Sequence, residues 1–159
     1  MIKMIRVDYR LLHGQVAFSW TQAIGADALL LVSDTVKDDP LRMQSLLLAK
    51  PEGTKVVVKN TEEAIQALTS GVTDKYKLFI ICETLSIAEQ IAKAVEMKQI
   101  NVGNIAYGEG KVQVSKSVFL NHQDAELLKK MVNEGYDLYI QMVPSEVKIS
   151  AAKVLKEVS

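Results

Sequence analysis

One stretch near the start of the chain decides the fold: Arg6-Val7-Asp8-Tyr9-Arg10-Leu11-Leu12-His13-Gly14-Gln15-Val16. An apolar, strand-like segment over residues 2–8 runs into a short polar loop, and an amphipathic helix begins directly after the loop. The loop therefore places a histidine at a helix N-terminus and at the carboxyl end of a strand. Helix N-terminal amides bind anions, above all phosphate, and ligands of open α/β sheets gather outside the carboxyl ends of the strands. The stretch thus predicts a site that holds a phosphoryl group on or beside His13.

Strand-like segments recur along the rest of the chain. The expected strands are Ile2–Asp8, Ala28–Val32, Lys55–Lys59, Tyr76–Ile81, Asn101–Ile105 and Asp137–Met142. Several are continuous apolar runs, which is typical of a parallel sheet that is covered on both faces.

Helix signals separate these strands. Pro40 favours the start of a helix, and three pairs of residues at capping spacing mark further helix starts: Asn60 with Glu63, Ser86 with Glu89, and Asn121 with Asp124. A last helix is expected over 149–158. The alternation predicts an α/β fold, a three-layer α/β/α arrangement around a mainly parallel sheet of about six strands. Residues 106–120 fit neither the helical period of 3.6 residues nor the strand period of two. We expect a short hairpin at 111–114 or an ordered loop there.

The composition narrows the class of protein. The chain has 159 residues, of which 48% are hydrophobic, and a formal net charge of zero. This suits a single domain over residues 1–159, and the charge balance argues against a nucleic-acid surface. No apolar run is long enough to span a membrane, and the first residues do not resemble a signal peptide. The single cysteine excludes an internal disulfide, so we expect a cytoplasmic location.

The neighbours of His13 suit phosphate chemistry. Arg10 is a candidate phosphate clamp, because its planar guanidinium matches tetrahedral oxygens. Gly14 leaves the backbone open to an approaching anion. Asp8, at the strand end, would orient His13 or Arg10. The simpler alternatives are that His13 only caps the loop, that Arg10 is a surface residue, and that Gly14 and Asp8 only form turns.

Other polar residues are weaker candidates. If the sheet is parallel, Ser33 and Asp34 share the rim of His13, whereas Asp38-Asp39 are expected to cap the next helix. Cys82 follows an apolar strand; a thiolate can carry a phosphoryl group, but such a cysteine is usually buried and inert. His122 is expected to be exposed. No metal-ligand spacing or nucleotide-binding loop occurs, so the sequence requires no cofactor and no metal.

The 6–16 stretch strongly resembles the phosphorylation-site segment of the IIB components of bacterial sugar phosphotransferase systems (PTS) in the mannose/fructose/sorbose family, which typically reads Arg-Ile-Asp-x-Arg-Leu-Ile-His-Gly-Gln-Val. The resemblance continues through 32–34 with 38–39, 101–104, 109–111, 115–118 and 141–144, and so covers most of the chain. Ser33 departs from the asparagine that is more frequent in the family.

The resemblance implies a parallel α/β fold and a phosphocarrier. A histidine of a IIA protein would donate a phosphoryl group to His13, with its Nδ1 atom as the acceptor, and the group would pass to a sugar during uptake through the membrane components IIC and IID. By the same match, Arg10 would lie against the phosphoryl group, Gly14 and Gln15 would contact it, and Asp8 would belong to the site. Mannose, fructose, sorbose and N-acetylgalactosamine all remain open as the sugar. We expect a monomer that associates peripherally with the membrane complex.

Three alternatives remain from the sequence. A regulatory or binding module of the same fold would hold a phosphorylated ligand at the His13 loop without covalent modification. A stand-alone enzyme would use His13 as an acid or base, for which a deep pocket and a second titratable group would be needed. In the third, Cys82 would carry the phosphoryl group in place of His13.

Overall fold

A seven-stranded sheet forms the centre of the computed structural model, which describes residues 1–158 and the side chains as far as residue 155. Its strands, in spatial order, are β3 (Lys55–Lys59), β2 (Ala28–Val32), β4 (Leu78–Cys82), β1 (Ile2–Asp8), β5 (Gln99–Asn104), β8 (Asp137–Ile140) and β9 (Ile149–Ser150). Every neighbouring pair is parallel except β8 and β9. A separate antiparallel hairpin joins β6 (Val112–Ser115) to β7 (Val118–Leu120).

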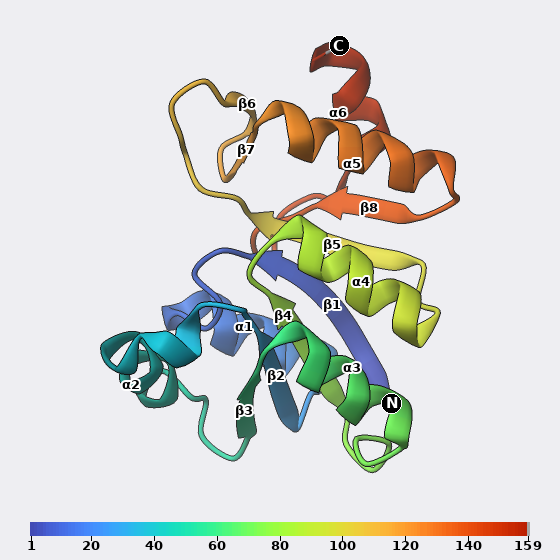
Figure 1. Ribbon diagram of the computed structural model, residues 1–159. Coiled ribbons are helices and arrows are strands. Elements are labelled where there is room, and N and C mark those ends of the chain that lie inside the picture. Colours follow the sequence, from blue (N-terminus) through green and yellow to red (C-terminus); the bar gives the residue numbers. More distant parts are fainter. Residues whose placement is uncertain (159) are drawn as a thin grey trace.

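Helices cover both faces of the sheet (Figure 1). They are α1 (Gly14–Ile24), α2 (Pro40–Leu48), α3 (Thr61–Ser70), α4 (Leu85–Val95), α5 (His122–Asn133) and α6 (Ala151–Val158), with a 3-10 turn over Val36–Asp38 before α2. One buried cluster joins α1 and α2 to one face, and a larger cluster joins α3, α4, α5 and α6 to the other. The expected three-layer α/β/α fold is therefore confirmed. None of the helices within residues 1–158 is long and apolar enough to cross a membrane.

Strands β2 and β4 are apolar at every position because both of their faces are covered. In β2, Leu29 and Leu31 enter the cluster under α1 and α2, whereas Leu30 and Val32 enter the cluster under α3 and α4. All five residues of β2 and of β4 are buried. Burial of such side chains contributes on the order of 1.5–3 kcal/mol each, and it holds the carboxyl ends of the strands in a fixed rim.

Several expected boundaries were wrong by a few residues. Strand β4 begins at Leu78 rather than Tyr76, β5 begins at Gln99, and β8 ends at Ile140. The expected helix over 149–158 begins at Ala151, because the two preceding residues pair with β8 as a seventh strand. The hairpin alternative for 106–120 is confirmed, although its strands extend beyond the expected 111–114.

Most helix starts have the expected caps. Asn60 and Asn121 each form a capping box, and Asp39 rather than Asp38 caps α2, its side chain accepting a bond from the Arg42 amide at 3.1 Å. The capping box predicted at Ser86 was wrong. Helix α4 begins two residues earlier, where the Thr84 hydroxyl accepts a bond from Ile87 N at 3.1 Å.

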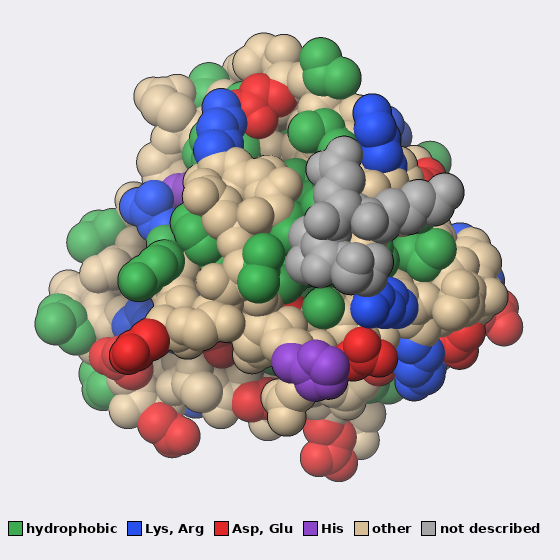
Figure 2. Space-filling model, turned by 90° about the horizontal axis from the view of Figure 1, so that it is seen from above, with side chains coloured by type: hydrophobic (Ala, Val, Ile, Leu, Met, Phe, Trp, Pro, Cys, Tyr) green, Lys and Arg blue, Asp and Glu red, His purple; other side chains and the backbone are tan. Residues whose placement is uncertain are grey.

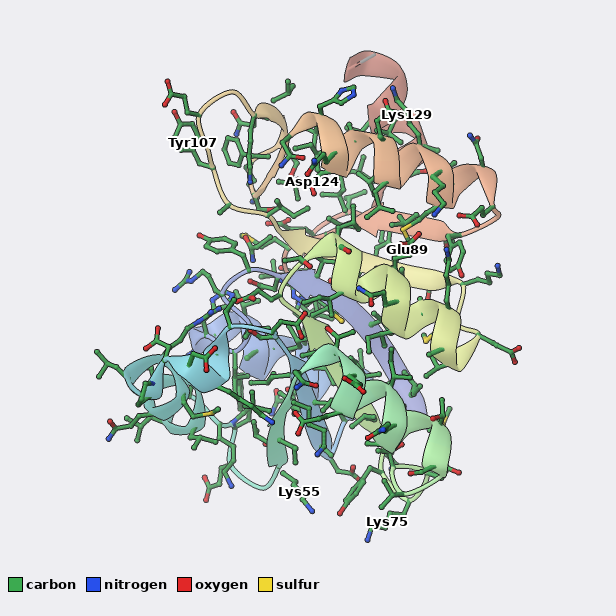
Figure 3. The ribbon with its side chains drawn as sticks, viewed as in Figure 1. Lys55, Lys75, Glu89, Tyr107, Asp124 and Lys129 are labelled. Atoms are coloured by element: carbon green, nitrogen blue, oxygen red, sulfur yellow. The ribbon has the colours of Figure 1, made fainter. Side chains whose placement is uncertain are left out.

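Glu89, the expected partner of Ser86 in that box, instead lies between helices. Its carboxylate accepts bonds from Lys93 on α4 at 3.1 Å and from Lys130 on α5 at 3.3 Å (Figure 3). These ion pairs contribute little each, and they direct the Glu89 carboxylate toward α5 and not toward the helix start.

Replacing Thr84 by alanine is therefore expected to lower the free energy of unfolding by about 1 kcal/mol, the usual value of an N-cap side chain. The matched Ser86→Ala change, at an exposed helix position, is expected to alter the free energy of unfolding by less than about 0.5 kcal/mol. Urea unfolding of both variants checks the assignment. A larger loss for Ser86→Ala than for Thr84→Ala would contradict it.

Candidate active site

The loop between β1 and α1 is anchored by two buried leucines. Leu11 and Leu12 are 1% and 3% exposed and belong to the core under α1. Leu11 adopts a left-handed backbone conformation with φ of 59°, and its amide donates to the Asp8 carbonyl at 3.0 Å. A non-glycine residue in this region costs of order 1 kcal/mol and persists only where packing imposes it. The buried side chains thus impose the turn that presents His13.

The His13 ring is held by one hydrogen bond. Its Nε2–H donates to Asp8 Oδ2 at 2.9 Å, and the side chain is 12% exposed. Among the described residues, nothing hydrogen-bonds to Nδ1. Because the Asp8 carboxylate can only accept, the bond places a proton on Nε2, and in the neutral ring the lone pair is then on Nδ1. The ring is therefore oriented with Nδ1 as its nucleophilic atom.

Asp8 is completely buried and accepts four hydrogen bonds. Besides His13, the donors are Arg6 Nη2 at 3.1 Å, Asn104 Nδ2 at 2.9 Å and the Arg10 amide at 3.0 Å. Burial alone would raise the pKa of Asp8, but the bonds from His13 and Asn104 and the charge of Arg6 outweigh it and hold the pKa below its ordinary value. Asp8 is thus a fixed anion beneath the His13 ring.

This pKa shift predicts a contribution to acid stability. Because the pKa is lower in the folded chain, the unfolded chain binds more protons below the ordinary aspartate pKa of about 3.9. The stabilisation from Asp8 is complete above that pH and is lost as the pH falls through the folded-state pKa. Urea unfolding between about pH 5 and pH 2 should therefore show a steeper loss of stability in the wild type than in Asp8→Asn. Equal slopes for the two proteins would contradict the shift.

The start of α1 has no side-chain cap. His13 occupies the N-cap position with an extended backbone but accepts no bond there, whereas α2, α3, α4 and α5 each begin with a capping side chain. The first amides of α1 therefore have no acceptor within the helix. Such a helix end attracts an anion at the position of the His13 ring.

The structure places the other predicted residues differently. Gly14 has φ of 43°, and an added Cβ would meet nothing within 4 Å, so its backbone conformation rather than lack of space favours glycine. Arg10 bonds to Asp8 through its amide only; its exposed guanidinium has no partner among the described residues. Gln15 is exposed in the first turn of α1. His13, Asp8 and the loop backbone thus form one group, beside which the Arg10 side chain is unrestrained.

A second polar group lies on the same rim. Glu83, after β4, accepts bonds from Ser33 Oγ at 3.0 Å and pairs with Arg42 at 2.6 Å. Arg42 also donates to the carbonyl of Tyr9 at 3.1 Å, so this group supports the His13 loop from outside. The Asp34 side chain does not belong to this second polar group.

The Asp34 carboxylate accepts bonds from both the amide and the hydroxyl of Thr61, at 2.9 and 3.0 Å. It therefore joins the end of β2 to the start of α3 and has no contact with His13. Cys82 is fully buried, and burial raises the pKa of its thiol, so it presents no thiolate at the rim. His122 is exposed at the start of α5, as expected.

Comparison with known proteins identifies the family. The family model described as "PTS system sorbose subfamily IIB component" matches residues 2–159. The chain belongs to this family. It is 32% identical over 149 residues to the N-acetylgalactosamine-specific phosphotransferase enzyme IIB component 1 of Escherichia coli K12, covering 92% of this chain and 94% of the relative. Against the sorbose-specific EIIB component of Klebsiella pneumoniae, the identity is 27% over 157 residues, covering 98% and 96%.

Solved structures of this family have the same fold. The crystal structure of the IIBSor domain of the sorbose permease from Klebsiella pneumoniae superposes with a TM-score of 0.89 at 26% identity, covering 100% of this chain and 98% of the other. The family resemblance seen in the sequence is confirmed. This IIB component is a phosphotransferase component of a sugar uptake system, and such components transfer phosphoryl groups to sugar during uptake.

Three residues without a role predicted from the sequence lie at the His13 loop of this IIB component: Arg6, Asn104 and Arg42. One signal was available: Arg6 lies between Ile5 and Val7 in an apolar strand, on the side that also carries Asp8. Asn104 and Arg42 gave no comparable signal, because their roles depend on pairing between distant strands and helices.

Proposed function

We propose that His13 is the residue that carries the phosphoryl group, and that residues 1–159 act as one IIB domain. The observation that carries the proposal is the ring orientation: Asp8 accepts the Nε2 proton, so Nδ1 keeps its lone pair at the uncapped start of α1. The nucleophile Nδ1, the Asp8 carboxylate that orients the ring and the anion-binding end of α1 then lie at one position.

The transfer follows from this arrangement. The Nδ1 lone pair attacks the phosphorus of a phosphohistidine on the donor, a new N–P bond forms, and the donor nitrogen leaves with the electron pair of the old N–P bond. His13 gains positive charge as its N–P bond forms, and the Asp8 carboxylate stabilises that charge through Nε2–H. The helix amides, Gly14 and Gln15 among them, and the Arg10 guanidinium stabilise the phosphoryl oxygens. In the second transfer, the oxygen of a sugar hydroxyl attacks the phosphorus, the N–P bond breaks with its electron pair returning to Nδ1, and the hydroxyl proton passes to solvent. His13 thus returns to its neutral form.

The partners follow from the family. We propose a IIA protein as the donor and a sugar held by membrane components IIC and IID as the acceptor, with this chain cytoplasmic, monomeric and peripheral to the membrane. Among the relatives are components named for N-acetylgalactosamine, mannose and sorbose, so we propose a sugar of this family's range, with fructose also open. The interfaces are transient, since two partners use the same histidine in turn. The surface seen in Figure 2 mixes acidic, basic and apolar side chains without a patch of one charge.

The experiment that tests this function is intact-protein mass spectrometry. The chain is incubated with phosphoenolpyruvate, the general phosphotransferase proteins and, in separate reactions, a mannose-class and a sorbose-class IIA. We expect the mass of a single acid-labile phosphoryl group, located on the peptide that contains His13. Absence of the shift while both IIA proteins are phosphorylated would favour the module that binds a phosphorylated ligand without covalent modification.

A further inference from the structure

Arg6 is a charged residue in the middle of the sheet. Its side chain is 1% exposed, although it lies in β1 between buried apolar neighbours. The ring of Trp20 on α1 covers the guanidinium, with 5.6 Å from Cζ to the ring centroid. Burial lowers the pKa of Arg6, and the charge and hydrogen bond of Asp8 oppose that shift. A buried cation of this kind requires its partners to be fixed.

The guanidinium is hydrogen-bonded to β5, to the residue that follows β8 and to Asp8 on its own strand. Its Nη1 donates to Asn101 Oδ1 on β5 at 2.6 Å and to the carbonyl of Gln141, after β8, at 3.2 Å. Asn101 Nδ2 donates to the same carbonyl at 3.0 Å. The other arm, Nη2, donates to Asp8 Oδ2 at 3.1 Å, the same oxygen that accepts from His13. Arg6 thus sets the position of that oxygen together with Asn104, whose Nδ2 donates to it at 2.9 Å.

Gly103 makes room for this side chain. A Cβ built at Gly103 would lie 2.1 Å from Cζ of Arg6 and 2.3 and 2.4 Å from its two terminal nitrogens. Gly103 has no positive φ that would require glycine. The absence of a side chain at this position of β5 is therefore explained by the Arg6 guanidinium alone.

We propose that Arg6 is a positioning residue for phosphoryl transfer, which acts through Asp8 to hold the His13 ring in the Nε2–H form with Nδ1 directed outward, and that Gly103 serves this by admitting the guanidinium. The proposal rests on the proposed function of His13. Arginine rather than lysine is needed, because only a planar fork donates to Asp8 on one arm and to Asn101 and Gln141 on the other. The relay, that is, the bonds from Arg6 through Asp8 to His13, lies inside the sheet. Docking of a partner at the rim therefore does not disturb the support of the ring.

The test combines imidazole ¹⁵N NMR of the unphosphorylated protein, at about pH 8 where free imidazole is neutral, with the rate of phosphoryl transfer from IIA. The variants are Arg6→Met, Arg6→Lys and Gly103→Ala. Leu68→Ala is the control, since it removes a buried side chain from α3 on the opposite face of the sheet. Circular dichroism reports the folded fraction, and rates are expressed per folded molecule.

We expect the wild type and Leu68→Ala to show a protonated Nε2 and an unprotonated Nδ1. Arg6→Met and Gly103→Ala should show a mixture of the two tautomers and a transfer rate lower by about 10–100-fold, the effect of a misplaced reacting group, with Arg6→Lys between them and the wild type. Wild-type tautomer and rate in folded Arg6→Met would overturn the proposal. If Arg6→Met does not fold, the same result in Arg6→Lys and Gly103→Ala would overturn it. The NMR readout needs no phosphorylation, so it separates failure of this relay from failure of the His13 assignment.

Discussion

Replacing His13 by alanine is expected to abolish phosphorylation of this chain by IIA. The change removes Nδ1, the ring nitrogen that has no hydrogen-bond partner among the described residues, while the core residues that anchor the loop remain in place. Radiolabel transfer from phosphoenolpyruvate, measured with equal amounts of folded protein, checks the result.

The control for this prediction is His122→Ala, which removes the second histidine from an exposed position on α5. It is expected to label like the wild type. Label that persists in His13→Ala but disappears in Cys82→Ser would contradict the assignment, although the complete burial of Cys82 argues against that outcome.

Replacing Asp8 by asparagine is expected to slow phosphoryl transfer by about 10²–10⁴-fold. In hydrolases that use a His–Asp pair, this change allows the wrong imidazole tautomer and costs about 10⁴ in rate. It also leaves the buried Arg6 cation without its carboxylate, so a loss of about 3–5 kcal/mol in stability is expected. Single-turnover transfer from phosphorylated IIA, at a temperature where circular dichroism shows both proteins folded, measures the rate.

Asp34→Asn is the matched control, because Asp34 follows β2, another parallel strand of the sheet, but binds Thr61 instead of His13. Its transfer rate is expected to remain within about twofold of the wild type, while its stability falls by about 1–2 kcal/mol through the weakened bonds to α3. A rate loss in Asp34→Asn equal to that of Asp8→Asn would show that any aspartate of the rim matters, and the specific role of Asp8 would then be wrong.

The fold could be predicted from the sequence because local and tertiary signals agree. The apolar run at Leu78–Ile81 is a local pattern that falls within β4, although the expected strand began at Tyr76. The helix starts at Asn60 and Asn121 are local patterns too, and both are found where they were expected. The start of α4 was misplaced because Ser86 and Glu89 have the right spacing, while Thr84 lies two residues earlier and caps just as well. The spacing of two residues cannot decide which of two hydroxyls the helix uses.

The core of the site was predictable only in part. The position of His13 at a helix start followed from the strand–loop–helix pattern, and the nearby Asp8 was a natural candidate to orient it. The bond from Asn104 could not be predicted, since it joins residues 96 positions apart and requires β1 and β5 to be neighbours. The same holds for β9, whose two residues form a strand only because β8 offers a free edge.

The central claim is that Asp8 holds Nε2 and leaves Nδ1 to take the phosphoryl group. Phosphorus and nitrogen NMR of the phosphorylated, ¹⁵N-histidine-labelled chain tests it most directly, because the ³¹P–¹⁵N coupling identifies the bonded ring nitrogen. The account predicts phosphorus bonded to Nδ1 of His13, with a proton on Nε2 that still donates to Asp8. Phosphorus bonded to Nε2 would contradict it, since that atom would have to leave the Asp8 carboxylate for the transfer to occur.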